Sequence, residues 1–329
     1  MALVYHKAVP THPVPQRALD AIAADAHLPI CATCGTQYSS KIEGICPCCA
    51  DERQWSPATG QEWTSLAELA THTHALQVDS EDARIEFIEA SPPFAINQTP
   101  ILLNTHAGHY IWDCHAPFTP ALAGYLAALN PPLKAIAISH PHFFSTSLVW
   151  ARALRVPLYL CAADREWYAR ASDVTASDDV RFWTGRADLG PGVTLVQCGG
   201  HFPGSSVLYW DRGAEPDAAP AEPAPATGNP STKKGLLLVS DTMMVCADRR
   251  GFTFMWSYPN MIPLRPADAV AVVAAVDGLE YGAACSTWPN RMIRTNAKAT
   301  VHASLARYLD ATGWELDGGV RGALRPRAK

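Results

Sequence analysis

Three histidines and one aspartate stand at positions suited to metal binding. His140 and His142 follow the apolar run LKAIAIS. In an extended stretch, residues two apart point to the same side, so both imidazoles can reach one ion. His201 in GGHFPGS and Asp241 in LLLVSDT each lie where an apolar, strand-like run meets a turn. These four residues are therefore candidate metal ligands.

A second group of candidate ligands is the cysteine-rich segment CATCGTQYSSKIEGICPCC. It contains two CxxC pairs, Cys31 with Cys34 and Cys46 with Cys49, while Cys48 is a spare thiol. Two such pairs can converge tetrahedrally on one Zn²⁺, and four protein ligands leave no open coordination position. We therefore predict a structural zinc ribbon. The alternative is a set of reduced cysteines in a loop-rich arm.

Composition excludes several classes of partner. The net charge is −5 and 17% of residues are charged, so the chain has no basic surface for nucleic acid. The N-terminus lacks a basic region followed by an apolar run, and no segment offers about 18 uninterrupted apolar residues. We expect a cytoplasmic protein without a membrane partner, whose cysteines are thiols or metal ligands.

Helical and strand-like patterns alternate along the chain. Residues 118–129 and 145–154 have helical patterns, whereas residues 133–139 and 156–162 indicate buried strands. This alternation predicts a sheet covered by helices. A further helix is predicted in SLAELATHTHAL, and another near the C-terminus with Ala297, Val301 and Leu305 on one face.

Three regions are predicted. Residues 1–26 form a lead-in, residues 27–75 the zinc ribbon with its following helix, and residues 76–329 the large domain. Within that domain, the Pro/Ala-rich residues 213–234 lack large apolar side chains and are expected to be the disordered tip of a long hairpin.

Four segments resemble the metallo-β-lactamase superfamily. YIWDC, SHPHFFS, GGHFPGSSVLYW and VSDT occur in the order of that family's motifs, and the resemblance spans about residues 82–329. It implies an α+β fold, an αββα sandwich with metal in a cleft at the sheet edges. It also implies roles for five residues: His140, His142 and His201 as ligands of the first metal, Asp241 as bridging ligand, and Asp113 as the aspartate that supports the site.

The sequence departs from this family where a second metal would bind. The His-x-His-x-Asp-His motif has Phe144 and Ser145 in its last two positions, and CSTWPNRM stands where a final histidine is usual. The resemblance therefore implies a site for one ion. Trp288, Asn290 and Arg291 take the place of that last segment and are expected to face the cleft as substrate contacts.

The resemblance implies a metal-dependent hydrolase for a small-molecule ester, thioester or lactone. Zinc bound by three imidazoles and a carboxylate can lower the pKa of its water to near 7 and polarise a carbonyl. Asp241 could replace the missing motif aspartate as the base.

Two alternatives remain open. His140, His201 and Asp241 also match the iron ligands of the persulfide dioxygenases, because two histidines and a carboxylate suit non-haem Fe(II). Alternatively, the fold has lost catalysis and binds a ligand or protein partner, with the zinc ribbon as docking module. The sequence leaves homo-oligomerisation open.

Overall fold

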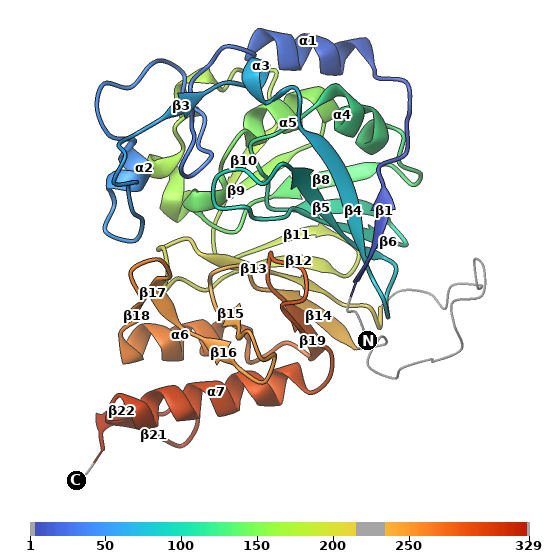
Figure 1. The fold of residues 1–329 in the computed structure, drawn as a ribbon. Coiled ribbons are helices and arrows are strands. Elements are labelled where there is room, and N and C mark those ends of the chain that lie inside the picture. Colours follow the sequence, from blue (N-terminus) through green and yellow to red (C-terminus); the bar gives the residue numbers. More distant parts are fainter. Residues whose placement is uncertain (1–3, 215–233, 328–329) are drawn as a thin grey trace. The chain divides into compact units, whose positions relative to one another are not determined.

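The computed structural model describes residues 4–214 and 234–327 (Figure 1). The chain forms two compact units, Met1–Trp183 and Thr184–Lys329. Each unit combines a sheet with helices, so the α+β class predicted from the sequence is confirmed. The predicted boundaries at residues 26 and 75 remain predictions. Most of the predicted hairpin tip, residues 215–233, lies outside the described residues.

Unit 1 is built on an eight-stranded sheet with the strand order β1-β4-β5-β6-β7-β8-β9-β10. The strands are β1 (Val4–Ala8), β4 (Thr73–Asp79), β5 (Ile85–Ser91), β6 (Ile101–Thr105), β7 (Gly108–Trp112), β8 (Leu133–Ala137), β9 (Leu158–Cys161) and β10 (Val180–Trp183). Pairing is antiparallel from β1 to β7 and parallel from β7 to β10. Part of the predicted lead-in, β1, thus forms the edge of the sheet.

Three helices of unit 1 pack against one another on one side of this sheet (Figure 1). They are α1 (Gln16–Ala24), α4 (Pro120–Ala127) and α5 (Ser147–Leu154). Thr119 caps α4 by accepting a hydrogen bond from Leu122 N, and Pro120 begins the helix, where its missing N–H costs nothing. Almost all of α5 is buried, which places the loop before it against the core.

One helix expected from the sequence in unit 1 is wrong. The helix predicted in SLAELATHTHAL is only α3 (Leu66–Leu69), and the chain continues as β4. Here Leu76 and Val78 are buried and the strand pairs with both β1 and β5, so sheet pairing overrides helix propensity.

The cysteine-rich segment lies between α1 and α3. It has two short paired strands, β2 (Ile30–Cys31) and β3 (Trp63–Thr64), and one helical turn, α2 (Pro47–Ala50). Few apolar side chains surround the cysteines themselves, and those that do include Ile42, Trp63 and Ala169. The module therefore has a small core of its own.

Unit 2 contains a six-stranded sheet with the order β11-β12-β13-β14-β19-β20. The strands are β11 (Arg186–Gly190), β12 (Val193–Gln197), β13 (Ser206–Trp210), β14 (Gly235–Leu238), β19 (Tyr281–Cys285) and β20 (Met292–Ile293). β13 and β14 pair antiparallel, so the two strands that flank the Pro/Ala-rich segment lie side by side.

Two helices, α6 (Pro266–Val276) and α7 (Ala297–Ala311), pack together and against this sheet. The stripe predicted on α7 is buried, since Ala297, Val301, Leu305 and Leu309 are all in the core of unit 2. The smaller elements of the chain are β15 (Met244–Val245), β16 (Phe252–Thr253), β17 (Met255–Ser257), β18 (Ile262–Pro263), β21 (Trp314–Asp317), β22 (Ala323–Pro326) and the 3₁₀ turns η1 (Pro141–Phe143), η2 (Ala162–Trp167) and η3 (Ala171–Asp173). Among the described helices, none has the length and apolar character needed to cross a lipid bilayer.

Candidate metal centres

The four cysteines of the two CxxC pairs come together within unit 1. Their Sγ atoms all lie within 4.8 Å of one another. Cys31 Sγ is 3.6 Å from Cys49 Sγ, and Cys34 Sγ is 3.7 Å from Cys46 Sγ. A tetrahedron with metal–sulfur bonds of about 2.3 Å has edges of about 3.8 Å, so the four sulfur atoms fit a closed zinc site.

Neighbouring groups donate hydrogen bonds to these sulfur atoms. Gln61 Nε2 donates to Cys31 Sγ at 3.0 Å, and the Tyr38 hydroxyl lies 3.1 Å from Cys46 Sγ. Such donors stabilise charge on a metal-bound thiolate and orient it. The spare Cys48 is outside the group of four, and its backbone N–H donates to the Tyr38 hydroxyl instead.

The four thiols differ in pKa. The pKa of Cys31 lies far below its usual value, because Cys34, Cys46 and Cys49 donate hydrogen bonds to its sulfur. The pKa values of those three thiols are raised, chiefly because each donates to Cys31. Without an ion, three of the four thiols therefore keep their protons, which a bound metal must displace, so metal affinity at this site should fall as the pH falls.

Unit 1 also holds the first pair of candidate ligands for the other site. His140 follows β8 in extended conformation, while His142 lies in the 3₁₀ turn η1, where an extended stretch was predicted. The two rings are buried, 5.1 Å apart between centroids, and a nitrogen of each lies within 4.8 Å of the other. The turn thus brings the imidazoles together, although not by the alternation of a strand.

Two residues beside this pair hold its backbone and ring. Asp113 is fully buried, and its Oδ1 accepts a hydrogen bond of 2.7 Å from Ser139 N. Ser139 Oγ lies 2.8 Å from His140 Nδ1. A histidine whose Nδ1 is engaged in this way coordinates a metal through Nε2. Asp113 therefore holds the backbone of the loop that carries His140 and His142.

Unit 2 holds the second pair. His201 and Asp241 are buried, and a ring nitrogen of the first lies within 4.8 Å of a carboxylate oxygen of the second. His201 Nδ1 donates to Met255 O at 3.1 Å, which again directs Nε2 to a ligand role. Gly200, just before His201, has a φ of +85°, and a Cβ there would lie 2.9 Å from Val272 Cγ2. Only glycine fits this turn.

Tyr258 stands beside the second pair. Its ring centroid is 5.8 Å from that of His201, and its hydroxyl donates to Asp241 O at 3.3 Å while accepting from Met244 N at 3.0 Å. Burial raises the pKa of Tyr258 well above its usual value, so it remains a neutral hydrogen-bond donor.

One relative decides the family. The uncharacterized protein YmaE of Bacillus subtilis (strain 168) is 33% identical over 291 residues, which are 87% of this chain and 97% of YmaE. The chain belongs to the YmaE family. No family model matches the sequence.

Solved structures similar to this YmaE-family chain include metallo-β-lactamases, the superfamily whose motifs the sequence resembles. Rm3 is 16% identical, with a TM-score of 0.41, over 70% of this chain and 90% of its own. SMB-1, solved in a complex with mercaptoacetic acid, is 15% identical, with a TM-score of 0.42, over 69% and 92%. The Cronobacter sakazakii enzyme with a HARLDQ motif is 16% identical, with a TM-score of 0.39, over 70% and 90%.

The expected substrate contacts of this YmaE-family chain lie in the segment after β19. Arg291 Nη1 donates to Val245 O at 3.3 Å, and Asn290 has a left-handed backbone that turns the chain after Trp288. Sequence spacing did not single out Thr287, whose Oγ1 donates to Ser240 Oγ at 2.9 Å, next to Asp241. Roles for Trp288, Asn290 and Arg291 in substrate binding remain predictions.

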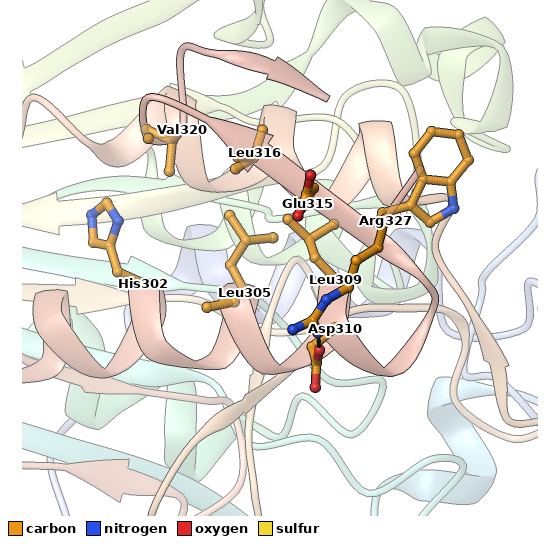
Figure 2. Close-up of a pocket in the computed structure, with 11 residues that line it drawn as sticks. His302, Leu305, Leu309, Asp310, Glu315, Leu316, Val320 and Arg327 are labelled. Atoms are coloured by element: carbon orange, nitrogen blue, oxygen red, sulfur yellow. Dashed lines mark ion pairs between the residues drawn. The ribbon is translucent and has the colours of Figure 1, made fainter. Parts of the chain in front are cut away.

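A cavity of about 440 Å³ in unit 2 is separate from the His201–Asp241 pair. It lies between α7 and the β21–β22 hairpin (Figure 2). Leu305, Leu309 and Leu316 line it, and Arg327 forms an ion pair with Asp310 at its edge. Neither His201 nor Asp241 is among the lining residues, so this cavity does not serve the candidate ligands.

Proposed function

We propose that the chain is a metal-dependent hydrolase with one active-site ion, held jointly by the pair His140–His142 and the pair His201–Asp241. The observation that carries this proposal is that each unit contains a buried pair of side chains that could bind a metal. The donor atoms of each pair lie within 4.8 Å of each other, and each of the four residues follows a strand of the sheet in its unit. The four-cysteine group is proposed as a separate, structural zinc site.

The donor set fits zinc better than a hard cation. Three imidazoles and one carboxylate are nitrogen- and oxygen-rich ligands that zinc accepts, whereas Mg²⁺ and Ca²⁺ prefer oxygen alone. An ion bound there would polarise a substrate carbonyl and lower the pKa of its water to near 7. The substrate class is a small-molecule ester, thioester or lactone.

Residues of the chain would accept the proton from water and hold the metal ligands in position. Asp241 would act as ligand and as acceptor of the proton that the attacking water loses, since its carboxylate stands beside His201. Tyr258 fixes the backbone of Asp241 through its hydroxyl, and Ser139 fixes the ring of His140. These contacts hold the donors in place before substrate arrives.

Metal content tests this proposal. The wild type should carry two ions per chain, and the variant His140→Ala/His201→Ala should carry one. The variant His302→Ala is a matched control, because this partly exposed histidine in α7 pairs with Asp277 instead. One ion per chain in both wild type and double variant would contradict the proposal and favour a non-catalytic binding protein.

The identity of the second ion separates the enzymatic alternatives. Zinc, together with hydrolysis of a panel of thioesters, lactones and simple esters that His140→Ala/His201→Ala abolishes, would support the hydrolase. Iron, together with O₂ uptake on a persulfide, would replace it with the dioxygenase alternative.

A further inference from the structure

Ser145 connects the loop that carries His140 and His142 (the histidine loop) to the cysteine-rich segment between α1 and α3 (the cysteine module). It lies three residues after His142, and its backbone φ of +42° falls in the left-handed region. Its Oγ donates to Gly35 O at 3.1 Å, and its carbonyl accepts from Gln37 N at 3.3 Å. Gly35 belongs to the first CxxC turn, where its N–H donates to Cys31 O at 2.9 Å. Two hydrogen bonds of Ser145 therefore connect the histidine loop to Gly35 and Gln37.

Gln37 and Phe144 also contact other parts of unit 1. The Gln37 side chain accepts a hydrogen bond from Arg170, which is buried and also donates to Asp25 Oδ2 at 3.0 Å. Phe144, the neighbour of Ser145, is buried with its ring 5.4 Å from that of Tyr168. Both motif positions that depart from the metallo-β-lactamase pattern, Phe144 and Ser145, thus serve packing within unit 1.

An ion bound by the four cysteines would hold the first CxxC turn and, through it, Gly35. The module has a small core composed largely of the cysteines themselves, and such a segment depends on metal for its folding. If the module lost its ion, Ser145 would lose the fixed position of its acceptor Gly35 O while its backbone kept an unfavourable conformation. A strained backbone conformation persists only when the surrounding structure enforces it.

We propose that the cysteine module positions the His140–His142 pair, with Ser145 as the positioning residue, so that metal in the cysteine site strengthens metal binding at the histidine site. This inference rests on the proposed function, because it assumes an ion at His140, His142, His201 and Asp241. It adds that the chain uses position 145 to connect two metal sites.

The test is a metal titration of the full chain. In wild type loaded with cobalt, sulfur-to-cobalt charge transfer reports the cysteine site. The histidine site is followed by the d–d absorbance that remains after the contribution of the cysteine site, scaled by its charge transfer, has been subtracted. Ser145→Ala removes the bond to Gly35 O and should weaken cobalt binding at the histidine site by about fivefold, the loss expected for one hydrogen bond. Charge transfer from the cysteine site should be unchanged.

Two matched variants exclude a general effect on stability. Ser172→Ala removes a hydroxyl that lies 3.4 Å from Ser39 Oγ, another contact of the module, and should leave both affinities unchanged. Ser145→Asn should restore binding, because asparagine tolerates the left-handed conformation and can donate to Gly35 O. Stripping the cysteine site of wild type with a mercurial, while circular dichroism confirms that the chain stays folded, should weaken the histidine site at least as much as Ser145→Ala.

The outcomes separate the two hypotheses. Wild type that binds two ions, with Ser145→Ala and stripped protein retaining wild-type affinity at the histidine site, overturns the coupling alone. Wild type that binds cobalt only at the cysteines overturns both the proposed function and this inference. A fall in affinity with Ser145→Ala that Ser172→Ala does not share supports the coupling.

Discussion

The two candidate metal centres differ in how their ligands are brought together. The cysteine ligands lie between positions 31 and 49 of one unit, whereas His140 and Asp241 belong to different units. Two CxxC turns are local structures, and each brings its sulfur atoms close with little help from the rest of the chain. The candidate histidine and aspartate ligands depend on strands, and hydrogen bonds support the rings of His140 and His201 and the backbone of Asp241. A local site can therefore be recognised from spacing, but a dispersed site requires the fold.

Loss of the cysteine ligands should have the largest effect. Cys31→Ser/Cys34→Ser should remove one ion per chain and destabilise unit 1 by several kcal/mol, because structural zinc supplies folding free energy (on the order of 10 kcal/mol in zinc-finger peptides). Metal analysis and thermal melting measure both effects. Cys48→Ser is the control and should retain the ion at the four-cysteine group. Unchanged zinc and an unchanged melting temperature in the double variant would show that the cluster is not a metal site.

Substitution of Asp113, which holds the histidine loop, should lower the free energy of unfolding by a smaller amount. Asp113→Ala leaves Ser139 N buried without its acceptor and places alanine at a φ of +65°, so we expect a loss of about 3 kcal/mol in the free energy of unfolding. Asp113→Asn keeps an acceptor and tolerates this φ, so most stability should remain. Urea titration distinguishes them. Equal stability of the two variants would mean that the hydrogen bond to Ser139 does not hold the loop.

Two histidines of unit 1 that are not candidate ligands should make the free energy of unfolding depend on pH. This effect should be smaller still. Burial lowers the pKa of His74 to about 4, and it lowers that of His115 well below its usual value. A lowered histidine pKa means that the unfolded chain binds more protons, so stability is full above pH 6.5 and is lost as the pH falls toward 4.

His74 alone should account for about 2 kcal/mol between pH 7.5 and pH 5, by about 1.4 kcal/mol per pH unit below 6.5. His74→Gln can still donate to Pro117 O, as His74 Nε2 does, and should show a shallower pH dependence of the urea midpoint. Measuring the wild type and His74→Gln with a chelator present removes the contribution of metal release to the pH dependence of the urea midpoint. If the two pH profiles are parallel, His74 is not protonated on unfolding.

Much of the fold could be predicted because the patterns were local and long enough. The stripe from Ala297 to Leu309 indicates a helix with one buried face, and the structure confirms it. The SLAELATHTHAL prediction failed because pairing of β4 with strands on both sides is a non-local interaction. His142 was expected to share a strand with His140, yet Pro141 begins a 3₁₀ turn there. The geometric reason for that pair was therefore wrong, and its role as metal ligands remains a prediction.

The sequence by itself determined which four cysteines come together, the order of the candidate histidine and aspartate ligands, and the helices with clear apolar faces. In each case the information lies within a few turns or one strand, where spacing dictates which side chains share a face. Tertiary structure alone decided that Asp113 binds Ser139 N, that His201 meets Asp241, and that Ser145 is clamped to Gly35. These contacts join residues 26 to 110 positions apart, and only the packing of strands and loops brings such residues together.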